Sequence, residues 1–476
     1  MRVLLIYTNR EQSPYPVLPL GLAYVDASLR QRGIETRLLD LCFAKDAAQV
    51  ARDAVQTFKP DCIGLSIRNI DNLTYDAPVR YLPAIRPIVD ACRQAFHAPI
   101  VAGGSGFSIF PQAILRFLDL QIGIVGEGEE AFPLWLACGD PHRVPGVVTN
   151  RDSPGDRQPP ARVRDLDALP IPTRDRAVSR TYELAGSAVN VQTKRGCPFR
   201  CLYCNYPVIE GRDVRLRSPQ NVGEELERLA RAGVKKIHFV DAVFTYPPDH
   251  AAAICEEILR RRLDLHWVCG ANPSSLSPEL ACLMRRAGCS GVELGIDAAN
   301  DGMLHRLRKG FTLDDVAACS EGCCQARLPF LFHLIFGGLG ETATTIEETL
   351  TAIGKMRATA VTYSFGLRIF PATGLAEVLQ QEGGAFSDDD LLEPRFYLSP
   401  ELAPKMMERV LNHARREPTW LAPRQRDSAI AKAIMRLGTR LGTTGPAWRH
   451  AAVGAPIKRA VAVVKAARTK RSVARA

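Results

Sequence analysis

The chain has 476 residues, of which 46% are hydrophobic and 24% charged, and its formal net charge is +10. This composition predicts a globular protein of two or three domains and excludes a wholly disordered chain, and no stretch reaches the roughly 18 uninterrupted apolar residues of a membrane helix. Thirteen Lys and Arg stand against Asp427 alone within 421–476, so the positive charge belongs to the tail and the remainder predicts no nucleic-acid interface.

The first 145 residues alternate between strand and helix patterns. We predict strands over 2–7, 36–40, 62–66 and 99–102 and helices over 22–31, 45–57 and 77–96. Such alternation produces a parallel sheet with helices on both faces, a Rossmann-like α/β domain. Sheets of this kind bind ligands beyond the carboxyl ends of their strands. The loops expected there are rich in glycine, which lets the backbone approach a large ligand closely.

Residues 146–185 are rich in proline, glycine and aspartate, a composition typical of a linker. A second strand–helix alternation follows in 186–395. We predict strands over 189–192, 236–240, 265–268, 291–295, 331–336 and 364–369 and helices over 219–232, 249–262, 277–287, 312–326 and 345–358. Six such units predict a partial (β/α)6 TIM barrel whose chemistry lies at the carboxyl ends of its strands.

Three thiols directly follow the first barrel strand, with the spacing Cys197-x3-Cys201-x2-Cys204. Three soft ligands in one loop suit a four-iron cluster, and they leave one iron open to a small molecule. A structural zinc site would need a fourth Cys or His at finger-like spacing, and a disulfide would leave one thiol over. No matching Cys or His pair lies nearby, which favours the cluster.

Fourteen cysteines and an N-terminal run too short for a secretion signal predict the reducing cytoplasm.

The run Thr193-Lys-Arg-Gly-Cys-Pro-Phe-Arg-Cys-Leu-Tyr-Cys204 resembles the signature of the radical S-adenosylmethionine (SAM) superfamily. The resemblance implies a [4Fe-4S] cluster whose open iron is chelated by SAM, and an external reductant of flavodoxin or ferredoxin type. It implies that Tyr203 packs the adenine. The other SAM contacts that it implies are Asp241, Glu293, Asp297, Gly337, Gly338 and Glu341. Acids at strand ends are as often helix caps, and His333 is expected to be a hydrogen-bonded core histidine.

Residues 1–145 resemble the cobalamin-binding domain that precedes one class of radical SAM enzymes. The positions at the landmarks of that domain are Pro19-Leu-Gly21, Ser66, Gly103, Gly104, Gly126, Glu127 and Gly128. The usual Asp-x-His-x-x-Gly motif is absent, because the first histidine is His97, so no imidazole is expected beneath the cobalt.

The run Ile67-Arg-Asn-Ile-Asp71 is similar to that of the tryptophan 2-methyltransferase family of thiostrepton biosynthesis, in which an arginine lies beneath the cobalt without bonding to it. Arg68 is expected in that role, since a guanidinium is not a metal ligand. The alternative is that Arg68 contacts a cobalamin side chain or phosphate, or only caps its loop.

The two implied cofactors point to a C-methyltransferase acting on a specialised metabolite or a peptide. A cyclase or ring-rearranging enzyme that uses cobalamin without methyl transfer is the alternative. A transfer-RNA methylthiotransferase would carry a second cysteine triad and a β-rich tail, and a cobalamin carrier would not need the thiol loop.

Residues 396–476 form a basic region that is predicted to be helical over 400–417, 427–441 and 456–470. The last segment has the pattern of a basic amphipathic helix that lies on a membrane or on an acidic partner, the alternative being a solvated tail.

Overall fold

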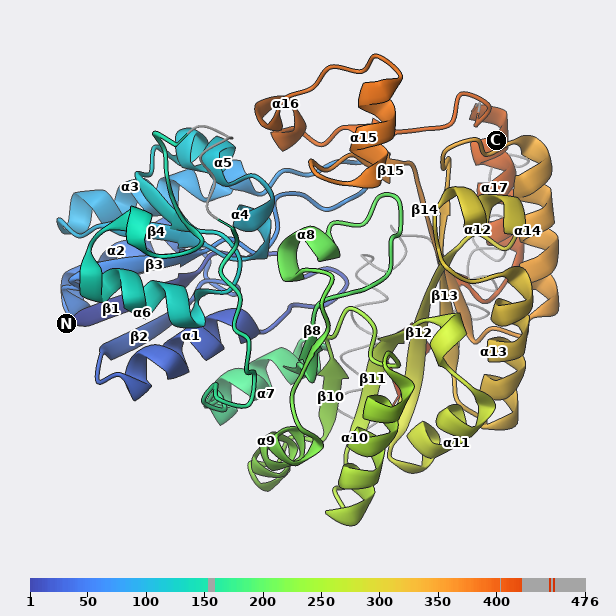
Figure 1. Ribbon diagram of the computed structural model, residues 1–476, viewed down its shortest axis with the longest axis horizontal. Coiled ribbons are helices and arrows are strands. Elements are labelled where there is room, and N and C mark those ends of the chain that lie inside the picture. The colour runs from blue at the N-terminus through green and yellow to red at the C-terminus, as the bar shows by residue number, and fades with distance from the viewer. Residues whose placement is uncertain (153–158, 403, 422–444, 447, 450–476) are drawn as a thin grey trace, which may run out of the picture.

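A computed structural model describes residues 1–152, 159–402, 404–421, 445–446 and 448–449. The chain forms an N-terminal lobe, residues 1–149, and a barrel, residues 186–421, which lie side by side (Figure 1). The predicted helices 427–441 and 456–470 lie outside the described residues. None of the helices in the described part combines the length and the apolar character that a bilayer span requires.

The N-terminal lobe is built on a six-stranded sheet of order β2-β1-β3-β4-β5-β6. Its strands are β1 (Arg2–Tyr7), β2 (Glu35–Asp40), β3 (Cys62–Ser66), β4 (Ile100–Gly103), β5 (Ile122–Ile124) and β6 (Val147–Thr149). Its helices are α1 (Leu20–Gln31), α2 (Ala47–Phe58), α3 (Arg86–Ala95), α4 (Ser105–Ile109), α5 (Pro111–Leu118) and α6 (Gly128–Cys138). All neighbouring strands are parallel except β5 and β6, so the predicted doubly wound α/β fold is confirmed.

Three details of this lobe differ from the sequence prediction. Strands β5 and β6 were not predicted, because three residues are too short to show a period. Because β6 pairs with β5, the sheet extends to residue 149 rather than ending at 145. The helix predicted over 77–96 begins only at Arg86, and residues 67–81 form a long loop at the carboxyl end of β3.

The segment between the lobes is not a free linker. It contains helix α7 (Arg176–Leu184), and its side chains Ala161, Val163 and Leu166 are buried. Ala161 packs on the N-terminal lobe, while Val163 and Leu166 lie between α1 and the barrel, which ties the two lobes together.

The barrel is an open parallel sheet of order β17-β14-β13-β12-β11-β10-β7. Its strands are β7 (Val189–Val191), β10 (Lys236–Phe239), β11 (His266–Ala271), β12 (Cys289–Asp297), β13 (Phe330–Phe336), β14 (Ala360–Phe365) and β17 (Trp420–Leu421). Helices α9 (Pro219–Arg231), α10 (Pro248–Arg260), α11 (Pro278–Arg286), α13 (Leu313–Gln325) and α14 (Ala343–Lys355) cover its outer face (Figure 1). The six predicted βα units are confirmed, although the sixth strand begins at Ala360 rather than at residue 364.

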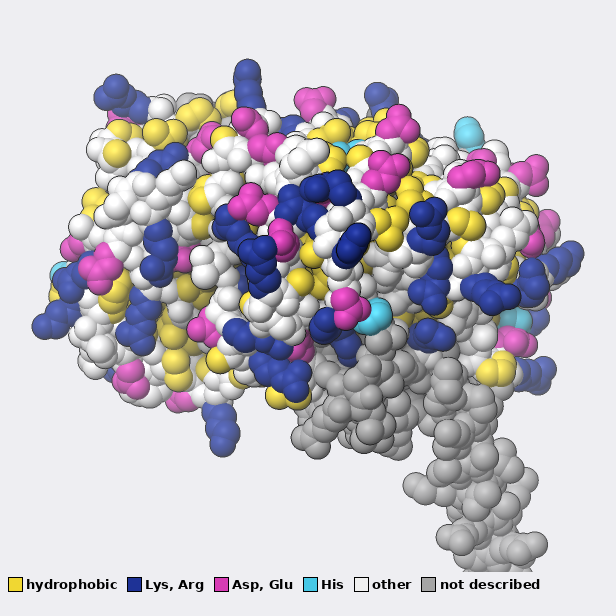
Figure 2. All heavy atoms as spheres, turned by 90° about the horizontal axis from the view of Figure 1, so that it is seen from below, with side chains coloured by type: hydrophobic (Ala, Val, Ile, Leu, Met, Phe, Trp, Pro, Cys, Tyr) yellow, Lys and Arg dark blue, Asp and Glu magenta, His cyan; other side chains and the backbone are white. Residues whose placement is uncertain are grey.

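Shorter elements decorate the barrel. They are β8 (Lys194–Arg195), α8 (Tyr206–Glu210), β9 (Arg215–Leu216), α12 (Asp301–Arg306), β15 (Leu367–Arg368), α15 (Gly374–Gln381), α16 (Asp388–Leu392), β16 (Phe396–Tyr397) and α17 (Pro404–Arg416). Single 3₁₀ turns lie at Leu82–Ala84, Pro141–Arg143 and Pro273–Ser275. Strand β17 was not predicted, since the sequence after residue 400 reads as helical throughout. On the face seen in Figure 2, Lys and Arg side chains are interleaved with Asp and Glu.

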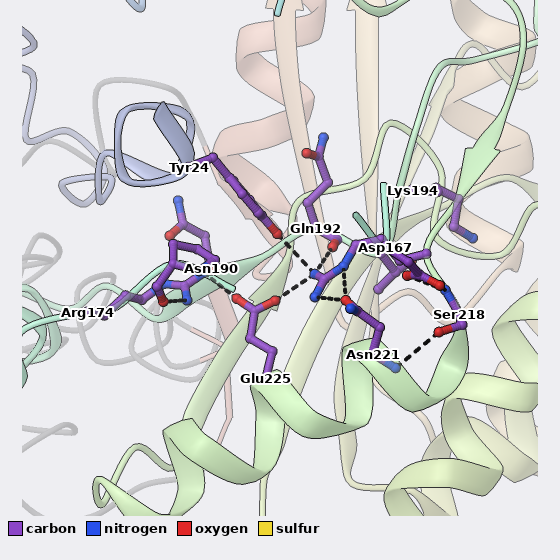
Figure 3. Close-up of polar contacts among 12 residues, drawn as sticks. Tyr24, Asp167, Arg174, Asn190, Gln192, Lys194, Ser218, Asn221 and Glu225 are labelled. Atoms are coloured by element: carbon purple, nitrogen blue, oxygen red, sulfur yellow. Dashed lines mark hydrogen bonds and ion pairs between the residues drawn. The ribbon is translucent and has the colours of Figure 1, made fainter. Parts of the chain in front are cut away.

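A buried charged cluster joins the segment between the lobes to helix α9. The Glu225 carboxylate pairs with Arg174 and with Arg217, each at 2.6 Å. Arg217 also donates to the hydroxyl of Tyr24 on α1, at 3.0 Å. Figure 3 shows Tyr24, Arg174 and Glu225 pointing toward one another. Burial raises the pKa of Glu225, but the two arginines outweigh it and hold the pKa below its ordinary value.

We predict that Glu225→Ala lowers the free energy of unfolding by about 3–5 kcal/mol, because it leaves two buried guanidinium groups without their counter-ion. The neighbouring Glu224→Ala is the matched control. Glu224 pairs with Arg228 on the surface, so its loss should cost less than about 1 kcal/mol. Denaturant unfolding followed by circular dichroism measures both.

The pH dependence of the Glu225 contribution follows from its lowered pKa. The stabilisation is fully present above the unfolded glutamate pKa of about 4.3 and is lost as the pH falls through the folded value. Equal effects of Glu225→Ala and Glu224→Ala at neutral pH would contradict this assignment.

Candidate functional site

The cysteine loop lies between β8 and α8, at the boundary between the two lobes (Figure 1). Gly196, which precedes the first cysteine, has a φ of +93°, and a Cβ there would lie 2.1 Å from the Asp213 carbonyl oxygen. Only glycine therefore fits this position. The Cys197 N–H donates to the Gly211 carbonyl oxygen at 3.0 Å, and the Leu202 N–H donates to Leu307 at 2.9 Å. The loop is thus held in shape by backbone hydrogen bonds to residues outside it.

The three thiols are free, Cys197 being buried and the other two half-buried. Burial raises the pKa of all three and takes that of Cys204 to about 12, while Lys309 acts in the opposite direction on Cys201. The three residues would hold an iron cluster as thiolates, because a coordinating thiol is deprotonated by the metal charge. Among the described residues no three His, Cys, Asp or Glu side chains are gathered closely enough to hold one metal ion. A cuboidal cluster spreads its thiolates over separate irons, and three soft donors fit it.

Tyr203 and Asp297, two of the predicted SAM contacts, meet beside the thiols. The Tyr203 hydroxyl donates to Asp297 Oδ2 at 2.6 Å. Lys309 donates to the same oxygen at 2.6 Å and is buried with it. Burial lowers the Lys309 pKa, but the Asp297 charge outweighs it and raises the pKa above its ordinary value. Sequence reasoning missed Lys309, because it lies twelve residues after Asp297 in a loop without a motif of its own.

The predicted SAM contact Asp241 holds the cluster strand. Its carboxylate accepts from the N–H and the hydroxyl of Thr193, both at 2.6 Å, and from the Lys194 N–H at 3.3 Å. Asp241 thus ties the end of β10 to the residues that precede the cysteines. Its carboxylate binds the neighbouring strand instead of capping a helix.

Gly337, Gly338 and Glu341 form one closed loop after β13. The Gly337 N–H donates to the Glu341 carboxylate, which lies almost fully buried. Burial raises the Glu341 pKa to about 7, although the N–H groups of both glycines act against it. The carboxylate therefore serves its own loop, and contact of the three residues with SAM stays a prediction.

Glu293 lies inside the barrel, four residues before Asp297 on β12. It accepts a hydrogen bond of 2.9 Å from the Trp448 indole N–H, and its other oxygen lies 3.5 Å from His333 Nε2. Burial raises the Glu293 pKa, but His333, His238 and the Trp448 N–H together outweigh it, and the pKa falls to about 2. His333 also bonds to Thr362 at 2.5 Å, so it is a satisfied interior histidine, as predicted. The indole of Trp448 packs on Gly291, a contact that the sequence does not reveal.

A cavity of about 740 Å³ opens between the carboxyl ends of the first sheet and the cysteine loop. The predicted cobalamin contacts that line it are Ser66, Arg68, Gly103, Gly104, Gly126, Glu127 and Gly128. From the barrel side it is lined by Asn190, Gln192, Arg195, Asn205, Tyr206, Glu210 and Phe370. A Cβ at Gly104 would lie 2.7 Å from the Ile67 carbonyl oxygen, where φ is +101°, so this wall is shaped by glycine. The cavity fits a large planar cofactor held by backbone.

Arg68 enters the cavity from the loop after β3. Its Nη1 donates to Asn69 Oδ1 at 3.1 Å. Among the described residues that line the cavity there is no histidine. The absence of an imidazole beneath the cobalt stays a prediction.

Glu127 is not free to contact a ligand with its carboxylate. It forms two hydrogen bonds with Arg215, at 2.5 and 2.8 Å, and pairs with Arg195 at 3.0 Å. It also accepts from the Val163 N–H at 2.7 Å. Burial raises its pKa, but the two arginines outweigh burial and lower the pKa. Glu127 therefore lines the cavity, while its negative charge is neutralised by two arginines of the barrel. Its place in a glycine-rich loop does not predict this role.

Comparison with known proteins identifies both lobes. Residues 191–353 match the Radical SAM superfamily model, and residues 8–136 match the B12 binding domain model. The chain is 26% identical to tryptophan 2-C-methyltransferase of Streptomyces laurentii over 443 residues, covering 79% of this chain and 74% of the relative. It is 27% identical to hopanoid C-3 methylase of Methylococcus capsulatus, covering 62% of this chain and 56% of the relative.

The fold has a close counterpart among solved structures. The radical SAM methyltransferase TsrM from Kitasatospora setae, solved with tryptophan and the SAM analogue aza-SAM, superposes with a TM-score of 0.85. The two are 25% identical, over 98% of this chain and 99% of that one. The cysteine loop, the cavity and both domain matches agree, and the chain therefore carries the radical SAM and B12-binding domains of a cobalamin-dependent radical SAM methyltransferase.

Proposed function

We propose that the methyl acceptor of this enzyme is a carbon atom of tryptophan or of a closely related indole. The observation that carries the proposal is Arg68, which lines the cavity where many cobalamin proteins place a histidine. It occurs in a chain that is similar over nearly its whole length to a methyltransferase solved with tryptophan. A small molecule of this size would enter from the side on which the barrel faces the cavity.

The bound cofactors supply the activated methyl group and the one-electron chemistry, while the protein orients and shields them. Cys197, Cys201 and Cys204 hold the cluster, and the Tyr203–Asp297–Lys309 group lies beside it. We assign this group to SAM, with Tyr203 against the adenine. An external donor of flavodoxin or ferredoxin type is proposed as the source of electrons.

The role proposed for Arg68 is to cover the lower face of the corrin without bonding to the metal. A guanidinium has five donors and no acceptor, so it has no electron pair to offer a cobalt ion. Its hydrogen bond to Asn69 fixes the direction in which it points. A vacant lower face weakens the hold of the metal on a methyl group above it, which favours transfer to a poorly activated carbon.

The barrel side of the cavity carries two aromatic side chains. Tyr206 lies two residues after Cys204 and is 39% exposed. Phe370 lines the same cavity. Aromatic rings stack on one another with favourable geometry, so these residues suit a flat heterocycle. They support an indole over a flexible aliphatic acceptor.

We predict that anaerobically reconstituted enzyme, given cobalamin, SAM, a reductant and L-tryptophan, forms a singly C-methylated tryptophan. Liquid chromatography with mass spectrometry measures the product and locates the methyl group by fragmentation. 2-Methyltryptophan is the control acceptor, since its C2 position is blocked. Methylation of a non-indole acceptor together with no product from any indole would contradict the proposal. Parallel measurement of 5′-deoxyadenosine decides whether the deoxyadenosyl radical takes part.

We predict that Arg68→His introduces a nitrogen ligand beneath the cobalt. The electron paramagnetic resonance spectrum of the bound cob(II)alamin should gain nitrogen superhyperfine splitting that the wild-type spectrum lacks, and methyl transfer should slow by at least about tenfold, or about 1.4 kcal/mol. Arg80→His, in the same loop outside the cavity lining, is the matched control. Nitrogen splitting in the wild-type spectrum would show that the lower face is already ligated, against the proposal.

A further inference from the structure

The cysteine loop and the cavity wall share a set of buried charges. Arg195 lies on β8, two residues before Cys197, and its guanidinium reaches into the N-terminal lobe. Its Nη2 lies 2.6 Å from Glu129 Oε1, and its Nη1 lies 3.0 Å from Glu127 Oε2. All three side chains are less than one-tenth exposed. The bonds therefore link the cluster loop directly to the segment that lines the cavity.

A second path runs through the neighbouring strand. Arg215 on β9 is the register partner of Arg195 and forms the two-pronged pair with Glu127. Arg215 also donates to the Glu210 carbonyl oxygen at 3.0 Å. The side chain of Glu210 in turn accepts from the N–H of Gly196, directly before Cys197, at 3.0 Å. The first path thus ends at Arg195 and the second at Gly196, the two residues that directly precede Cys197.

On the side of the N-terminal lobe, both paths begin in one short segment. Glu127 and Glu129 flank Gly128, the first residue of α6, and all three line the cavity. The Glu127 N–H is held by Ala161 at 2.9 Å, so the segment is supported from behind. One face of the segment therefore meets the cavity, and its charges meet the cluster loop.

Buried ion pairs tolerate little displacement, because a charge that loses its partner away from water is strongly destabilised. The segment 127–129 and the loop that begins at Gly196 can therefore change position only together. A cofactor that fixes one of them in its binding shape favours the binding shape of the other. This is the physical basis of a coupling between two sites.

We propose that Arg195 is a positioning residue that couples cobalamin binding to cluster assembly. Through its ion pairs with Glu127 and Glu129, Arg195 fixes the position of the cavity wall relative to the cysteine loop. Each cofactor therefore binds more tightly when the other is present. The proposal uses the two cofactors of the family and does not depend on the identity of the methyl acceptor.

The test compares the affinity for hydroxocobalamin in full-length protein with and without the iron–sulfur cluster, by anaerobic equilibrium dialysis. In the wild type we expect the dissociation constant to be about 5- to 20-fold lower when the cluster is present, within the usual range of coupling between sites. In Arg195→Met, the ratio of the dissociation constant without the cluster to the dissociation constant with it should fall to within about twofold of one. Glu129→Gln is a milder variant that keeps the side-chain volume, and its ratio should fall in the same direction.

The matched control is Arg116→Met. Arg116 also pairs across the two lobes, with Asp389 at 2.6 Å, but this pair is about half exposed and does not touch the cysteine loop. The ratio of cobalamin dissociation constants without and with the cluster should be the same in Arg116→Met as in the wild type. A wild-type ratio of one would overturn the proposal without any variant. A uniform weakening of cobalamin binding in Arg195→Met, with the wild-type ratio retained, would also overturn it by showing a purely structural role.

Discussion

The structure depends on buried charges that must be paired across the boundary between its two lobes. The Glu127 and Glu129 carboxylates belong to the N-terminal lobe, and their arginine partners, Arg195 and Arg215, belong to the barrel. On another side of the boundary, Asp71 pairs with Arg368 at 3.0 Å, and both are almost fully buried. Neither lobe satisfies these charges alone, so the two sheets are fixed relative to each other.

This constraint brings the carboxyl ends of two parallel sheets to one cavity. In each lobe the strands are joined by helices that cover the sheet, and the loops at the carboxyl ends are left to bind ligands. The glycine-lined wall of the first sheet therefore faces the cysteine loop at the mouth of the barrel. The geometry would bring a cobalamin and an iron–sulfur cluster close to each other within a single chain.

Much of this arrangement was predictable from local pattern. Buried parallel strands such as β1 and β13 read as continuous apolar runs, and the spacing of the three cysteines is specific enough to name its chemistry. Short strands such as β5 and β17 carry too few residues to show a period, and their pairing depends on neighbours far away in the sequence. The role of Asp241 was open for the same reason, because a carboxylate at a strand end looks alike whether it binds a ligand or its own backbone.

The contacts that sequence reasoning missed are all long-range. Lys309 approaches Asp297 only after the turn that follows α12, and Glu127 finds its partners in strands about 70 to 90 residues later. No periodicity or spacing connects such positions, since the fold alone brings them together. Their charges were visible in the sequence, but their partners were not.

Trp448 shows that the barrel interior is completed from the far end of the chain. Its indole covers Gly291 and donates to Glu293, alongside the interior side chains Leu331 and Ala360. A shortened protein that stopped before Pro446 would leave this apolar floor open to water and remove a donor from a buried carboxylate. The catalytic domain therefore does not end at the last barrel strand, and a protein cut there would lack part of its own interior.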